Sequence, residues 1–211
     1  MGKAGRVWGF GILASLSLVI GAYALFLYGV PSSIADRPFV TEKAKELPDL
    51  WFTILWLHAV SSGIAITIGW IQFIAKIRIQ RLHVHRMIGL LYSVMVTVGG
   101  VTGIYLAWHA SGGWSGKTGF MVLAILWLYT LYRSLNSILV HQNAVEHGHW
   151  MIRNYALTCA AIALRIYAPL TAVLFGISDT EVSFIVIGWL CWVPNLLVAE
   201  LLINRIADKK H

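Results

Sequence analysis

The chain has 211 residues, of which 58% are hydrophobic and only 12% are Asp, Glu, Lys or Arg. Soluble domains carry roughly 25% charged residues, so this chain has too little polar surface to cover a water-facing shell. The net charge of +7 does not indicate nucleic-acid binding, because the basic residues are dispersed at the ends of apolar runs. The sequence therefore predicts an integral membrane protein in a lipid bilayer, organised as a single domain over 1–211.

Six apolar stretches are long enough to cross a bilayer as helices, which takes roughly 20 residues. Their apolar residues run continuously instead of alternating, and this excludes barrel strands. The predicted spans are 7–30, 51–75, 87–109, 120–140, 151–175 and 182–203. Residues 31–50, with three prolines and mixed charge, form the predicted outer loop. Short connections elsewhere make consecutive spans antiparallel neighbours, so the predicted fold class is an all-α transmembrane bundle.

The charges at the span ends predict the orientation of the chain. One side of the membrane would carry Lys3, Arg6, Lys76, Arg78, Arg81, Arg86, Arg153, Arg205, Lys209 and Lys210. The few basic residues on the other side are diluted by acidic ones. The positive-inside rule therefore places both termini in the cytoplasm.

Helical spacing predicts which faces of the second and third spans pack together. On the second span, steps of three or four residues join His58, Ser62, Ala65, Gly69 and Gln72. On the third span, small residues recur every fourth position at Gly99, Gly103 and Ala107. Such rows of small residues let helix backbones approach closely in lipid.

Two arginines inside the spans need partners, because a charge at bilayer depth costs at least about 2.5 kcal/mol. Arg133 shares a helix face with Tyr129, Ser137 and His141, and Arg165 shares one with Asn154, Thr158 and Ala161. Glu200 is the only carboxylate within a predicted span, and it lies at a different depth from Arg165. Helix carbonyls, a bound anion, a quinone oxygen or a cofactor carboxylate remain as partners for Arg165.

The last span contains Pro194, which frees a backbone carbonyl, and the adjacent Asn195 is placed to hydrogen-bond across the resulting kink. Cys159 and Cys191 fall inside apolar runs on different spans, and we interpret them as buried small residues without a disulfide.

Five of the eight histidines map to the predicted cytoplasmic face. His83 and His85 precede the third predicted span, and His141, His147 and His149 lie between the fourth and fifth. Neutral imidazole is the commonest protein ligand for haem iron, and His85 with His147 or His149 would supply two ligands at one depth. Solvated interfacial histidines are the alternative. The sequence supports one haem at most, because no helix carries two histidines about 13 or 14 residues apart.

Five stretches of the sequence resemble a family of predicted bacterial membrane proteins that is catalogued as a domain of unknown function. They are GWIQF (69–73), HRMIG (85–89), HGHWMIRNYAL (147–157), LRIYAPL (164–170) and WVPNLLVAE (192–200). The matching positions are His58, His85, Arg86, Gly89, His147, Trp150, Met151, Arg153, Arg165, Pro194 and Asn195. His149 stands where the family often has arginine, which favours His147 as a ligand. The resemblance implies a location in the bacterial inner membrane, and the organisation is similar to that of membrane b-type cytochromes.

Three functions follow from these patterns as hypotheses. In the first, His85 and His147 bind a b-type haem whose propionates Arg86, Arg153 or Arg133 neutralise, while His58 and Arg165 line a separate quinone or small-ligand pocket. In the second, the chain is a non-catalytic accessory or assembly subunit of a larger membrane complex and binds no cofactor. The third is a metal-dependent membrane enzyme or a transporter.

Overall fold

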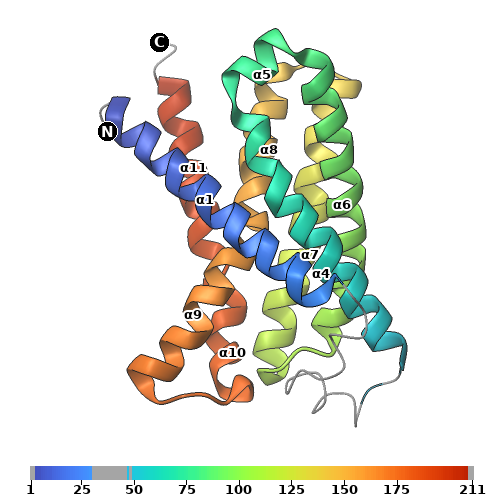
Figure 1. The fold of residues 1–211 in the computed structure, drawn as a ribbon, viewed down its shortest axis with the longest axis vertical. Helices are drawn as coiled ribbons and strands as arrows, with labels where there is room; N and C mark the ends of the chain where they lie inside the picture. The colour runs from blue at the N-terminus through green and yellow to red at the C-terminus, as the bar shows by residue number, and fades with distance from the viewer. Residues whose placement is uncertain (1–2, 30–46, 48, 209–211) are drawn as a thin grey trace. The chain divides into compact units, whose positions relative to one another are not determined.

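The chain folds into helices, as the computed structural model shows for residues 3–29, 47 and 49–208 (Figure 1). No strand occurs among these described residues, which confirms the all-α prediction. The elements are α1 (Lys3–Tyr28), α4 (Asp49–Gly69), the 3-10 helix η1 (Trp70–Phe73), α5 (Ala75–Gln80), α6 (Leu82–Trp108), α7 (Gly113–Leu139), α8 (Ala144–Thr158), α9 (Ala160–Phe175), α10 (Thr180–Leu190) and α11 (Val193–Ala207).

Most of the predicted outer loop, 31–50, lies outside the described residues. Its last two residues, Asp49 and Leu50, are not loop but already belong to α4. Lys209 and Lys210, which were counted for the orientation, also lie outside the described residues.

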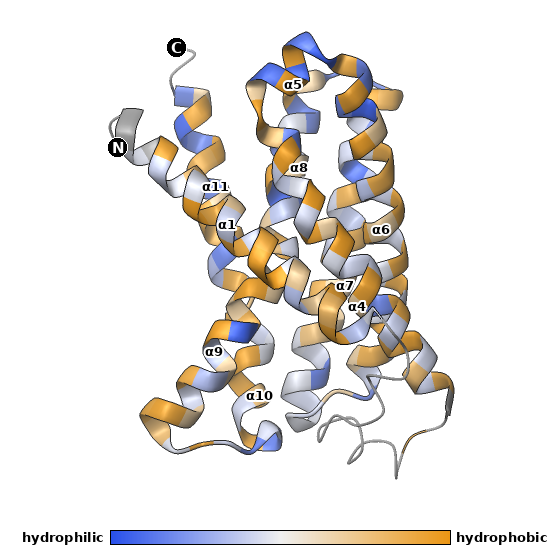
Figure 2. Cartoon of the chain, in the orientation of Figure 1, coloured by the Kyte–Doolittle hydropathy of each residue, from blue (hydrophilic) through white to orange (hydrophobic). Residues whose placement is uncertain are grey.

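Within the described part of the chain, six segments are long and apolar enough to cross a membrane, in agreement with the predicted number of spans. They are Val7–Tyr28, Leu50–Phe73, Leu82–Trp108, Gly113–Leu139, Ala144–Phe175 and Thr180–Ala207. Figure 2 shows hydrophobic residues along the helices and hydrophilic residues gathered around α5 and at the end of α11.

The third, fourth and fifth spans begin earlier than predicted, at residues 82, 113 and 144 instead of 87, 120 and 151. A helix satisfies its own backbone hydrogen bonds, so it extends beyond its apolar stretch through polar residues at the membrane surface. The predicted positions of the histidines are corrected accordingly. His83 and His85 lie in the first turn of α6, and His147 and His149 lie in the first two turns of α8.

The chain divides into two compact units, residues 1–102 and residues 103–211, and the boundary falls inside α6. The prediction of a single domain over 1–211 stays a prediction.

In the first unit α1 packs on α4, and the glycines Gly21 and Gly63 allow the two helices to approach closely. A Cβ atom on Gly21 would collide with the Thr67 hydroxyl and would lie 3.0 Å from the Gly63 carbonyl oxygen. Side chains of the second span also reach α6. The His58 Nδ1 lies 2.8 Å from the Gly99 carbonyl oxygen, and the Gln72 amide donates to the His85 carbonyl at 3.3 Å. The polar face predicted for this span therefore contacts the third span.

In the second unit α7 packs against α8 and α10, and α8 packs against α11. The contact between α7 and α10 is made by glycines. A Cβ atom on Gly119 would lie 2.8 Å from the carbonyl carbon and oxygen of Gly188, and one on Gly188 would lie 3.3 Å from the Gly116 Cα. Small residues at a helix contact give close van der Waals packing where no hydrophobic effect drives association.

The fifth and sixth spans are each interrupted near their middle. Cys159 separates α8 from α9, and Cys191 ends α10 just before Pro194 in the first turn of α11. The Asn195 amide donates to the Cys191 carbonyl at 3.0 Å and to the Ala156 carbonyl at 3.3 Å. The predicted kink, with Asn195 bonding across it, is confirmed, and the same side chain also ties α11 to α8.

Candidate functional site at the α7–α8 connection

Four charged residues of the second unit lie in one group that includes the Trp150 indole ring. We call this group the Trp150 cluster, and its members are Arg133 of α7, Glu146, Trp150 and Arg153 of α8, and Glu200 of α11. The guanidinium carbons of Arg133 and Arg153 each lie 4.6 Å from the centroid of the Trp150 ring. Indole attracts cations more strongly than the other aromatic rings. One side chain therefore contacts both arginines.

Helical spacing brings the α8 members of the cluster to one face. Glu146, Trp150 and Arg153 follow one another at steps of four and three residues, the spacing at which helix side chains are neighbours. The Trp150 indole N–H donates to Glu146 Oε1 at 3.2 Å. Asn143 is the N-cap of α8, and its side-chain oxygen accepts a hydrogen bond from the Glu146 backbone N–H at 3.0 Å. The cap fixes where α8 begins and so where Glu146 stands.

Each arginine of the cluster has its own carboxylate. Arg153 donates from Nε to one oxygen of Glu200 at 2.6 Å and from Nη2 to the other at 2.7 Å. Two parallel bonds of this kind make the strongest and most directional arginine–carboxylate pair. Arg133 donates from Nη1 to the Tyr129 hydroxyl at 2.9 Å and lies 3.5 Å from Glu146 Oε1. The two positive charges are therefore neutralised within the protein.

These pairs correct one prediction. Glu200 is not the only carboxylate within a span, because the early start of α8 brings Glu146 into the fifth span. Arg133 and Arg153 pair with Glu146 and Glu200, and their predicted role beside haem propionates stays a prediction. The predicted face of Arg133 is confirmed, since Tyr129 accepts its hydrogen bond and the Ser137 hydroxyl bonds to its carbonyl at 2.7 Å.

His147 is held in one orientation against α7. Its Nδ1 lies 3.0 Å from the Ser134 carbonyl oxygen and 2.9 Å from the Ser134 hydroxyl. A carbonyl oxygen only accepts hydrogen bonds, so Nδ1 carries the proton and donates it. In the neutral ring the lone pair is then on Nε2, the nitrogen that remains for coordination. His149, one residue beyond Gly148, is half-buried on the same helix.

Two further histidines adopt the same tautomer in different units. His58 Nδ1 lies 2.8 Å from the Gly99 carbonyl in the first unit, and His109 Nδ1 lies 3.0 Å from the Tyr105 carbonyl in the second. Arg165, also in the second unit, donates to the Ala161 carbonyl at 3.0 Å. A helix carbonyl, one of the partners expected from the sequence, is thus a partner of Arg165. The pocket predicted between His58 and Arg165 stays a prediction, because the two residues belong to different units.

The predicted pairing of His85 with His147 also joins residues of different units and stays a prediction. His85 is half-buried near the start of α6, and the neighbouring Arg86 is exposed. Among the residues that the structure describes, no three His, Cys, Asp or Glu side chains converge as a metal site would require.

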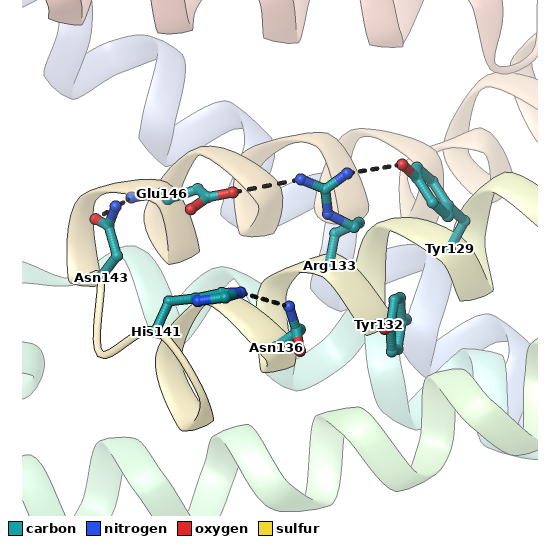
Figure 3. Close-up of a pocket in the computed structure, with 7 residues that line it drawn as sticks. All are labelled: Tyr129, Tyr132, Arg133, Asn136, His141, Asn143 and Glu146. Atoms are coloured by element: carbon teal, nitrogen blue, oxygen red, sulfur yellow. Dashed lines mark hydrogen bonds and ion pairs between the residues drawn. The ribbon is translucent and has the colours of Figure 1, made fainter.

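A polar cavity of about 640 Å³ lies beside the α7–α8 connection (Figure 3). Its lining consists of Tyr129, Tyr132, Arg133, Asn136, His141, Asn143 and Glu146. Figure 3 shows Arg133 between Glu146 and Tyr129, and the Asn136 amide donates to His141 Nε2 at 3.1 Å. The volume is within the range of small-molecule sites, which is roughly 300–1,000 Å³.

Sequence reasoning identified Arg133, Tyr129 and His141 as neighbours but missed most of this cavity. Tyr129, Tyr132 and Asn136 follow one another along α7 at steps of three and four residues, so they lie on one helix face. A polar row of this kind inside a span is the sequence pattern that could have indicated the cavity. Glu146 falls in the connection between the fourth and fifth predicted spans, so hydropathy alone does not indicate it as a lining residue.

Comparison with known proteins identifies one family. A family model described as "Predicted membrane protein (DUF2306)" matches residues 55–203, which is more than half of the chain. No curated protein and no solved structure matches the chain.

Proposed function

The chain belongs to the DUF2306 family of predicted membrane proteins, and from that premise we propose that it is a membrane redox protein in which His147 ligates a b-type haem. The protein is an integral membrane protein, and its described residues contain six helical segments long and apolar enough to span a bilayer. The proposed site lies where α7 connects to α8.

The charge pattern of the sequence favours an orientation with this connection, and with it both termini, on the cytoplasmic side of the bacterial inner membrane. A C-terminal reporter that fluoresces only in the cytoplasm tests that orientation, and a dark fusion would contradict it.

The observation that carries the proposal is the anchoring of the His147 ring. Metal-ligating histidines nearly always donate their second ring nitrogen to a carbonyl, carboxylate or water, which sets the tautomer and increases the basicity of the ligating nitrogen. The Nδ1–H of His147 is directed at the Ser134 carbonyl, and Ser134 is fully buried. Nε2 therefore has the lone pair that haem iron binds.

A haem held there would supply one-electron transfer, and residues of this chain would orient it. Ser134 fixes the direction of the imidazole. Arg133 precedes Ser134 in α7, and Glu146 balances its charge, so this pair adds no net charge beside Ser134. His85 remains the sequence-based prediction for the second iron ligand.

We expect His147→Ala to abolish haem retention while the protein still inserts into the membrane. In this proposal His147 is the one iron ligand that belongs to the second unit, and alanine has no imidazole to bind the iron. Haem per chain, measured by the pyridine haemochrome assay on purified protein, is the readout.

The matched control is His141→Ala, which removes an exposed histidine that accepts a hydrogen bond from Asn136 at the same end of the protein. It should keep the wild-type haem content. His85→Ala, examined in parallel, tests the predicted second ligand and should also lose haem. If His147→Ala and His141→Ala retain equal haem, His147 is not the ligand.

An accessory or assembly subunit is the second candidate, and the Trp150 cluster favours it. Every charge in that cluster is satisfied by another residue of the same chain, so no cofactor is needed to keep the arginines in the membrane. In that case the cluster joins α7, α8 and α11, and the chain works by contact with other membrane subunits. Copurification of a stoichiometric partner with a colourless protein would identify this function.

A further inference from the structure

We infer that the cavity beside the α7–α8 connection binds the headgroup of a quinone, a neutral ring with carbonyl acceptors. This site is distinct from the pocket that the sequence suggested between His58 and Arg165. It also differs from the proposed haem ligand His147, which is not among the lining residues. The inference rests on the charge, the hydrogen-bond donors and the location of the cavity.

The charges of the lining favour a neutral ligand. Arg133 and Glu146 both line the cavity and are 3.5 Å apart. An anion would have to lie beside the Glu146 carboxylate, and a cation would have to lie beside the Arg133 guanidinium, so each meets a like charge. A neutral polar ring meets neither penalty and leaves the pair intact.

The lining offers hydrogen-bond donors that suit carbonyl oxygens. The Tyr129 hydroxyl accepts from Arg133, so its own proton remains available to donate. Tyr132 presents a second phenol, and its side chain is 62% exposed. In Figure 3 Tyr132 lies beside the Arg133–Tyr129 pair but outside the marked interactions. The two phenol hydroxyls can donate hydrogen bonds to the quinone oxygens. The tyrosine rings themselves offer a flat surface on which a quinone ring can stack.

The location suits a ligand dissolved in the bilayer. Arg133 and Tyr132 lie within the fourth span, and Glu146 lies within the fifth. Large apolar side chains flank the connection and are exposed, namely Leu139 at 75%, Val140 at 66% and Val145 at 51%. A polar cavity next to an exposed apolar surface accommodates a headgroup with a hydrocarbon tail, because the tail covers apolar area while the ring enters the cavity.

The test measures binding of decylubiquinone to the purified full chain in detergent by isothermal titration calorimetry. Tyr132→Phe removes one hydroxyl and keeps the ring, so it should weaken binding about three- to tenfold. Tyr132→Ala also removes the ring and should weaken binding further. Because Tyr132 is largely exposed, neither substitution should disturb folding, and the haem content should not change.

The matched control is Tyr167→Phe, the same substitution on half-buried Tyr167 of α9, away from the cavity lining. It should bind decylubiquinone as the wild type does. Equal affinities of the Tyr132→Phe and Tyr167→Phe variants would overturn the inference, as would a wild-type chain that binds no decylubiquinone. Displacement of decylubiquinone by equimolar phosphatidylethanolamine would assign the cavity to a zwitterionic lipid headgroup and would also overturn it. Haem content, measured on the same samples, separates this outcome from failure of the haem proposal.

Discussion

Replacing Arg153 by methionine should lower the free energy of unfolding by about 2–3 kcal/mol, because it leaves Glu200 charged within the sixth span without its partner. Arg153 holds both carboxylate oxygens of Glu200, at 2.6 and 2.7 Å. Breaking a fully buried pair costs about 3–5 kcal/mol. The lower value is expected here since the Glu200 side chain is 41% exposed. Unfolding by sodium dodecyl sulfate in mixed micelles measures the change.

A double-mutant cycle separates the pair from the individual side chains. Glu200→Leu in the Arg153→Met background should restore most of the lost stability, because no unpaired charge then remains. Arg205→Met at the exposed end of α11 is the control and should change the unfolding free energy by no more than about 0.5 kcal/mol. Additive effects of Arg153→Met and Glu200→Leu would show that the two side chains are not coupled.

Replacing Gly119 by alanine should destabilise the protein by about 1–3 kcal/mol, because the new methyl group has no space. It would lie 2.8 Å from the backbone of Gly188 and 3.1 Å from the indole nitrogen of Trp189. The backbone of α10 cannot rotate away as a side chain could, so α7 and α10 have to separate. The same unfolding assay in mixed micelles measures the loss.

Gly148→Ala is the matched control for this substitution. Gly148 lies inside α8, and a Cβ atom there would have no neighbour within 4 Å. Alanine should therefore stabilise the protein by about 0.5–1 kcal/mol, the helix preference of alanine over glycine. We therefore expect changes of opposite sign in the free energy of unfolding for Gly119→Ala and Gly148→Ala. Equal destabilisation by the two substitutions would mean that the α7–α10 contact is not close-packed.

Much of the fold was predictable because the bilayer imposes simple rules on sequence. Continuous apolar runs predicted all six spans, and the Pro194–Asn195 pair predicted the kink with its hydrogen bond. The predicted starts of the third, fourth and fifth spans were wrong, because hydropathy identifies the apolar part of a helix and not its polar first turns. This error also placed His85 and His147 before their helices instead of within them.

The candidate site was predictable within single helices but not between helices. Spacing along α7 correctly grouped Arg133 with Tyr129. The partners on other helices, Glu146 for Arg133 and Glu200 for Arg153, depend on the depth at which two helices contact each other. Composition and periodicity contain no information on that register. The cavity was missed for the same reason, since its lining combines residues of α7, α8 and the connection between them.

The central proposal, a haem ligated by His147, is tested most directly by a reduced-minus-oxidised absorption spectrum of the purified chain from cells supplied with haem. A pyridine haemochrome assay on the same sample gives the stoichiometry. We predict a b-type signal corresponding to about one haem per chain, because a single anchored imidazole on α8 supports one site. A colourless protein from these cells would contradict the redox proposal and would leave the accessory-subunit function as the better explanation of the Trp150 cluster.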